Sequence, residues 1–164
     1  MTCVKESGAA EGDNAAGMEP ALVQELRRQR KQIRRRWETF LRLEKATSPL
    51  ANPDTLVFGV DRSLGEIFSG LLRPAGLKPP RGPARECGCG RHPLRAYYRA
   101  GEQAVLEALV LMQARRAPCE AAQRDREFAE VKAVVTALAQ RDIAALAGVC
   151  QLPPDPPPPP GGEE

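Results

Sequence analysis

Four stretches of this sequence repeat apolar residues every three or four positions, and segments rich in proline or glycine separate them. This spacing places the apolar side chains of each stretch on one face of an α-helix. We predict helices over about 20–45, 52–72, 93–115 and 120–148. Helices with one apolar face must bury those faces against one another. The predicted fold class is therefore all-α, a four-helix or slightly larger bundle with disordered termini.

Local signals mark where these helices begin and end. Pro20 follows Glu19 at an early helical position, where the missing N–H of proline costs nothing. Asn52 precedes Pro53, a pairing that predicts an N-cap followed by the first helical residue. The apolar spacing places Trp37 on the buried face of the first helix, Gly101 on that of the third and Leu146 on that of the fourth.

The chain has 164 residues, which fits one domain. We predict a disordered N-terminal arm over 1–18, a helical bundle domain over 19–150 and a disordered proline-rich tail over 151–164. A loop rich in proline, glycine and cysteine over 73–92 interrupts the bundle, and we expect no regular structure there. No apolar run approaches the ~18 residues that span a bilayer, and the start lacks an export signal. We therefore predict a cytoplasmic protein with reduced thiols and no membrane contact.

The loop ends in a small group of metal-ligand residue types. Cys87, Cys89 and His92 fall within six positions, and zinc prefers four thiolate or imidazole ligands. In an antiparallel bundle the start of the third helix lies near the end of the fourth, which makes Cys150 the sensible fourth ligand ahead of Cys119 or Cys3. One hypothesis is a zinc site at these four positions. Another is a thiol switch in which Cys150 pairs with Cys87 or Cys89. The alternative is a cluster of reduced thiols beside a helix N-terminus, with His92 as a capping or partly exposed residue.

The outer face of the first predicted helix is strongly basic. Seven of the ten residues 27–36 are arginine or lysine. One hypothesis is phosphate contact with a nucleic-acid partner through the basic face formed by Arg27, Arg28, Lys31, Arg34 and Arg35. The alternative is a solvated helix face, which is the commoner role of a charge run.

Motifs for catalysis are scarce. The chain has one histidine and lacks the Gly-x-Ser-x-Gly, phosphate-loop and His-Glu-x-x-His patterns. Glu127 and Glu130 share a helix face but lack the partners of a di-metal site. We expect one of Tyr97 and Tyr98 in the core and the other at its boundary. The sequence therefore predicts a protein that is not an enzyme and has no cofactor, the zinc hypothesis apart.

Residues 92–104, His-Pro-Leu-Arg-Ala-Tyr-Tyr-Arg-Ala-Gly-Glu-Gln-Ala, carry a resemblance. They resemble an Asn-Pro-Leu-x-x-Tyr-Phe-x-x-Gly-Glu-x-Ala-Leu segment of the N-terminal helical domain of bacterial RsbT co-antagonist (RsbRD-type) proteins. Trp37 and the helix starting at 52 fit the same all-helical family. The resemblance extends over about 20–150 and is specific around 92–112. His92 replaces the expected Asn, and only the proline tail follows the bundle, so we expect no phosphorylatable output domain.

That resemblance implies a sensory or protein-interaction input domain without catalytic residues. Our first hypothesis is accordingly a non-enzymatic bacterial sensory or regulatory interaction module that presents a helix face to a partner protein or to a second copy as a homodimer. The second hypothesis is a metal-binding or thiol-responsive protein, and the third is a nucleic-acid-binding protein.

Overall fold

The computed structural model describes residues 17–43, 52–77, 92–116 and 120–146, and every regular element in these ranges is helical. The α-helices are α1 (Pro20–Arg28), α2 (Arg30–Leu43), α3 (Pro53–Leu56), α4 (Val60–Leu72), α5 (Pro93–Gln113) and α6 (Ala121–Leu146). Two 3-10 turns, η2 (Val57–Gly59) and η3 (Pro74–Gly76), flank α4. The predicted all-α class is confirmed for the described part of the chain. The predicted arm up to residue 16 and the tail from residue 151 lie outside it.

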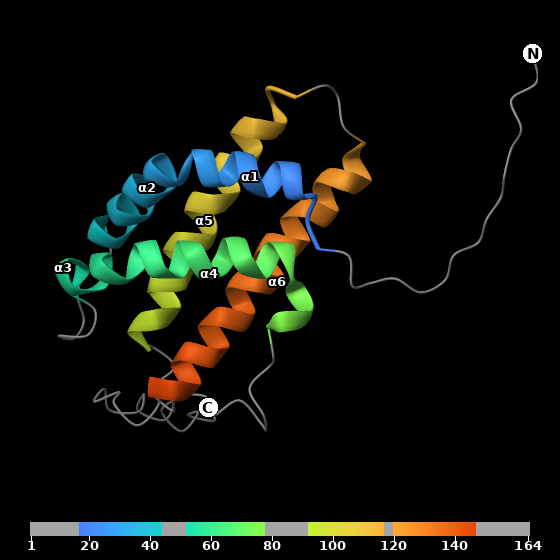
Figure 1. Cartoon of the computed structure of the whole chain (residues 1–164). Helices are drawn as coiled ribbons and strands as arrows, with labels where there is room; N and C mark the ends of the chain where they lie inside the picture. Colours follow the sequence, from blue (N-terminus) through green and yellow to red (C-terminus); the bar gives the residue numbers. More distant parts are fainter. Residues whose placement is uncertain (1–16, 44–51, 78–91, 117–119, 147–164) are drawn as a thin grey trace, which may run out of the picture.

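The long helices form two layers (Figure 1). In this view α1, α2 and α4 lie in front, and α5 and α6 run behind them in opposite directions. Helix α5 packs against α2 and α6, while α4 packs against α1, α2 and α6. The antiparallel pair brings the start of α5 close to the end of α6, as expected.

The predicted third and fourth helices are confirmed in place, whereas the first two differ from expectation. The first is two helices that meet at Gln29, a residue type that does not break helices by itself. Hydrogen bonds still cross the interruption, because the Ile33 N–H donates to the Gln29 carbonyl at 3.0 Å. The side chain of Arg30, directly after it, reaches the Asp61 carboxylate on α4 at 3.2 Å. The second predicted helix consists of α3, η2 and α4 in succession.

The predicted start at Asn52 is confirmed. Its side-chain oxygen accepts the N–H of Asp54 at 3.0 Å, and Pro53 occupies the first helical position. This bond satisfies one of the backbone donors that every helix N-terminus leaves unpaired.

Trp37 lies at the centre of the core, as predicted, with none of its surface exposed. Its indole N–H donates to the Tyr97 carbonyl at 2.9 Å, and the two rings lie 4.9 Å apart. The indole fits against α5 because Gly101 has no side chain there. Gly70 similarly permits the close approach of Val134, on α6, and of Leu77.

Three predictions about single residues or segments need correction. Met18, which we placed in the arm, is buried, and its N–H donates to the Leu71 carbonyl at 2.9 Å. Pro74–Gly76, for which we expected no regular structure, form a 3-10 turn because proline at the first position favours a tight turn. Leu146, which we placed inside the core, is 39% exposed at the last position of α6. Within the described ranges, no helix combines the length and apolar character that crossing a membrane requires.

Candidate functional site

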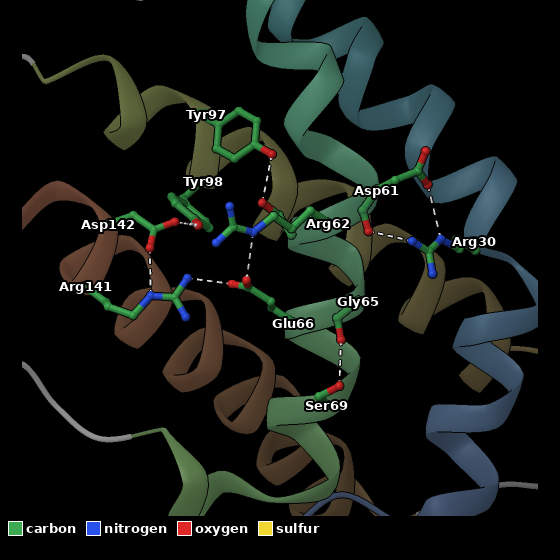
Figure 2. A network of polar contacts seen from close by, with 11 residues as sticks. Arg30, Asp61, Arg62, Gly65, Glu66, Ser69, Tyr97, Tyr98, Arg141 and Asp142 are labelled. Carbon is green, nitrogen blue, oxygen red and sulfur yellow. Dashed lines mark hydrogen bonds and ion pairs between the residues drawn. The ribbon is translucent and has the colours of Figure 1, made fainter. Parts of the chain in front are cut away.

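A group of polar side chains joins α4, α5 and α6, and we call it the tyrosine network (Figure 2). The Tyr97 hydroxyl donates to Ser63 Oγ at 2.9 Å, and the Tyr98 hydroxyl donates to Asp142 Oδ2. Arg141 then donates to Asp142 Oδ1 at 2.7 Å and to the Glu66 carboxylate. A chain of hydrogen bonds therefore ties the three helices together at one end of the molecule.

Both tyrosines lie in the core, with 3% and 2% of their surface exposed, so the expectation of one boundary residue is wrong. Burial raises the pKa of Tyr97 to about 12. Burial also raises the pKa of Tyr98, and the hydrogen bond to the Asp142 carboxylate raises it further. Both phenols are therefore protonated donors at neutral pH, which suits a role in holding helices together.

A hollow of about 350 Å³ lies beside the tyrosine network. Thr55, Gly59 and Leu94 line it together with the network side chains. The hydroxyl and carboxylate groups at its wall already bond to one another. We therefore assign these side chains to the stability of the helix junction.

His92 is 2% exposed and forms the N-cap of α5, which is the capping role given above as the alternative to zinc binding. Its Nδ1 accepts the Leu94 N–H at 3.2 Å, so the ring proton belongs on Nε2, which has no hydrogen-bond partner among the described residues. Burial lowers the pKa of His92, and the nearby Leu146 carbonyl opposes that shift. The neutral ring is favoured in this position.

Cys87, Cys89 and Cys150 lie outside the described residues, so the proposed zinc and thiol sites remain hypotheses. Among the residues that are described, no three potential metal ligands come together. The cap also restricts His92, since an imidazole whose Nδ1 accepts a hydrogen bond carries its proton on Nε2 and has no lone pair there for a metal. Zinc binding through Nε2 would require the cap to open.

The predicted basic face divides into paired and unpaired groups. Arg34 pairs with Glu38 at 2.7 Å and with Asp61 on α4. The neighbouring arginines Arg30, Arg36 and Arg42 also pair, with Asp61, Glu107 and Asp54 respectively. Arg27, Arg28, Lys31 and Arg35 are exposed and make no ion pair with any described residue. Of the five residues of the basic face, Arg34 alone therefore helps to hold α2 against α4, and the other four have no ion-pair partner among the described residues.

Sequence reasoning missed an exposed apolar surface on α5. Val110 is 49% exposed and Leu111 is 44% exposed, although neither belongs to the predicted apolar stripe. A signal was present, because residues 109–112 are all apolar, and a helix that is apolar on every side does not face water alone. We define the α5 face as Gln103, Leu106, Glu107, Val110 and Leu111.

Two shallow hollows flank the α5 face. The first, of about 370 Å³, lies between α2 and α5 and is lined by Gln32, Ile33, Arg35, Arg36, Thr39, Ala104, Glu107, Ala108 and Leu111. The second, of about 660 Å³, lies between α5 and α6 and is lined by Arg99, Glu102, Gln103, Leu106, Glu107, Val110, Leu111 and Lys132. Glu107 and Leu111 separate the two, so the hollows and the α5 face form one continuous surface.

One ion pair organises the border of this surface. Arg36 donates to Glu107 Oε2 at 2.7 Å, and its guanidinium lies 4.4 Å above the Phe40 ring. The hydrogen bond with Arg36 holds the pKa of Glu107 below its ordinary value. The carboxylate of Glu107 is therefore charged at neutral pH and already has a cationic partner.

Comparisons with protein-family models, with curated proteins and with solved structures find no match to this chain. The resemblance around residues 92–112 accordingly remains a prediction.

Proposed function

We propose that this chain is a non-enzymatic regulatory module that presents its α5 face to another protein. The observation that carries the proposal is the exposure of Val110 and Leu111 side by side on a packed helix, between two hollows that a partner side chain would fill. Contiguous exposed apolar surface bordered by polar groups is typical of interaction sites. Burying the exposed halves of these two side chains would contribute on the order of 2 kcal/mol to association.

The proposal includes the finer features that the sequence predicted. The chain would be a cytoplasmic bundle, slightly larger than four helices, of the input type implied by the RsbRD-type resemblance. Either a partner protein or a second copy would cover the α5 face. The resemblance supports this interpretation because its most specific part, residues 92–112, coincides with almost all of α5.

Site-specific photo-crosslinking in the native host tests the proposal. A photoreactive phenylalanine derivative replaces Val110 on the α5 face and, as a matched control, exposed Gln140, which lies on α6 and lines neither hollow. We expect a discrete protein adduct from position 110 and none from position 140. Equal adduct patterns from both positions, or no adduct from position 110, would refute the proposed function.

Light scattering then separates the two kinds of occupant. A homodimer predicts a doubled mass at tens of micromolar that the Leu111→Glu substitution reduces to the monomer mass. A mass equal to one chain in both proteins assigns the α5 face to a different protein.

A further inference from the structure

We propose that the partner seats an acidic amphipathic helix on the α5 face, with its apolar stripe on α5 and its carboxylates toward α2 and α6. The inference rests on the proposed function and names the chemistry of the partner. It follows from the exposed cations at the border, the excess of positive charge along the two hollows, and the shape of the exposed track on α5.

The border on the α2 side is a line of cations without partners among the described residues. Lys31 and Arg35 are four positions apart, so they lie one above the other on the same side of α2. Arg35 lines the first hollow directly. Arg27 and Arg28 bring two further exposed cations at the end of α1. A partner with negative charge beside its apolar stripe would meet Arg35 at the first hollow and Lys31 one helical turn before it.

The acids near this border do not neutralise it. Glu107 is held by Arg36 at 2.7 Å, so its charge is already matched. Four cationic and two carboxylate side chains line the two hollows, an excess of two positive charges. On the α6 side, Arg99 and Lys132 line the hollow together with Glu102, which makes no ion pair with a described residue, so one positive charge of the excess lies there. Both edges of the α5 face therefore favour an anionic partner.

The track between these edges fits a helix. Gln103, Leu106 and Val110 follow one another at intervals of three and four along α5 and form part of the second hollow. They span about 10 Å, or two helical turns, at 1.5 Å per residue. An incoming helix with apolar residues at i, i+3, i+4 and i+7 matches this track.

The same surface suits a nucleic acid less well. Base contacts on single strands depend on aromatic platforms, and none of the residues lining the two hollows is aromatic. A phosphate backbone would use the cations and leave Val110 and Leu111 in water. We therefore assign the surface to a protein helix and keep the oligonucleotide as a competing outcome of the test.

The experiment uses the full chain and three fluorescein-labelled 16-residue peptides that share one leucine stripe. They differ only in carrying glutamate, glutamine or lysine beside that stripe. A fourth peptide has the glutamates but serine in place of leucine. Fluorescence anisotropy at low and physiological salt measures the dissociation constants, and a labelled 16-nucleotide single strand serves as the competing anion.

We expect the glutamate peptide to bind most tightly and the lysine and serine peptides to bind at least tenfold more weakly. Arg35→Glu and Lys31→Glu should each weaken the glutamate peptide on the order of fivefold. The matched control is Arg124→Glu, which makes the same charge change at an exposed site of α6 outside both hollows. It should change the affinity less than twofold.

Each other outcome overturns the inference in a distinguishable way. If the three leucine peptides bind equally and Leu111→Ser weakens all of them, the interaction face is correct and its acidic selectivity is wrong. If no peptide binds, the inference fails, and crosslinking at position 110 decides separately whether the proposed function also fails. If the oligonucleotide binds more tightly than the glutamate peptide and loses affinity in Arg35→Glu, the basic border belongs to a nucleic-acid site.

Discussion

Replacing Gly101 by alanine tests the packing at the centre of the core. A β-carbon at this position would overlap the Trp37 ring and would lie 2.6 Å from its Cε2 atom. Trp37 is completely buried, and its indole N–H is bonded to the Tyr97 carbonyl. The ring therefore cannot move away without losing that hydrogen bond or displacing α2 from α5.

The magnitude follows from two opposing effects. Alanine favours the helical backbone over glycine by about 1 kcal/mol. Overpacking a core costs typically 1–3 kcal/mol, and a displaced indole N–H without a partner adds about 1–3 kcal/mol. We expect the free energy of unfolding to fall by about 2 kcal/mol. For a domain of this size that corresponds to a melting temperature lower by roughly 8 °C.

Urea unfolding followed by circular dichroism provides the measurement. The matched control is Gly65→Ala in α4, where an added β-carbon would have no neighbour within 4 Å. That variant should gain about 0.5–1 kcal/mol from helix propensity alone. The two substitutions are chemically identical, so the difference between them isolates the contact with Trp37.

The same substitution in a Trp37→Phe protein tests whether contact with the Trp37 ring causes the loss of stability. In Trp37→Phe the ring is smaller, and the added cost of Gly101→Ala should shrink by at least about 1 kcal/mol. A Gly101→Ala protein as stable as the wild type, or an equal cost in both backgrounds, would show that this contact does not limit the packing of α5.

Three further predictions concern protonation. The chain contains only two tyrosines, and both have a raised pKa. The absorbance of the folded protein at 295 nm should therefore stay flat from about pH 10 to 11, where the tyrosines of the unfolded chain titrate. Because the folded state keeps these protons to higher pH, the free energy of unfolding should fall as the pH rises above 10. His92 has a folded-state pKa below its ordinary value of 6.5, so its contribution to the stability of the fold is complete above that pH and is lost on acidification. The His92→Asn variant preserves a cap and should show a smaller drop in melting temperature than the wild type between about pH 7.5 and 5.5. An equal drop in both proteins would contradict the assignment. Burial, and then the charge of Glu127, raise the pKa of Glu130, so the ionised carboxylate destabilises the fold at pH values above the ordinary pKa of 4.5. The Glu130→Gln variant should therefore have a higher melting temperature than the wild type at neutral pH and lose that advantage near pH 4. A variant that is less stable than the wild type at neutral pH would exclude this explanation.

The helices themselves were largely predictable because their signals are local. The start at Asn52 and Pro53 is encoded in adjacent residues, and the cap bond forms within two positions. The apolar spacing of α5 placed Trp37's contact residue Gly101 on the buried face correctly. Such features need only the geometry of one helix, which a short window of sequence contains.

The candidate site was less predictable because its parts come from separate helices. Arg36 and Glu107 are 71 positions apart, and no local pattern shows that one neutralises the other. The basic face therefore appeared as one surface in the sequence, although Arg34 belongs to an ion pair with α4. Val110 and Leu111 were visible as apolar residues off the main stripe, but their exposure depends on which neighbours cover α5.

By itself, the sequence determined that the chain is helical, where α5 and α6 run, and which side of each helix is apolar. The tertiary structure alone decided that the first helix is interrupted at Gln29, that both tyrosines are buried, and that the α5 face stays open. The physical reason is range: periodicity and capping act within one or two turns, whereas burial and ion pairing depend on contacts between residues tens of positions apart.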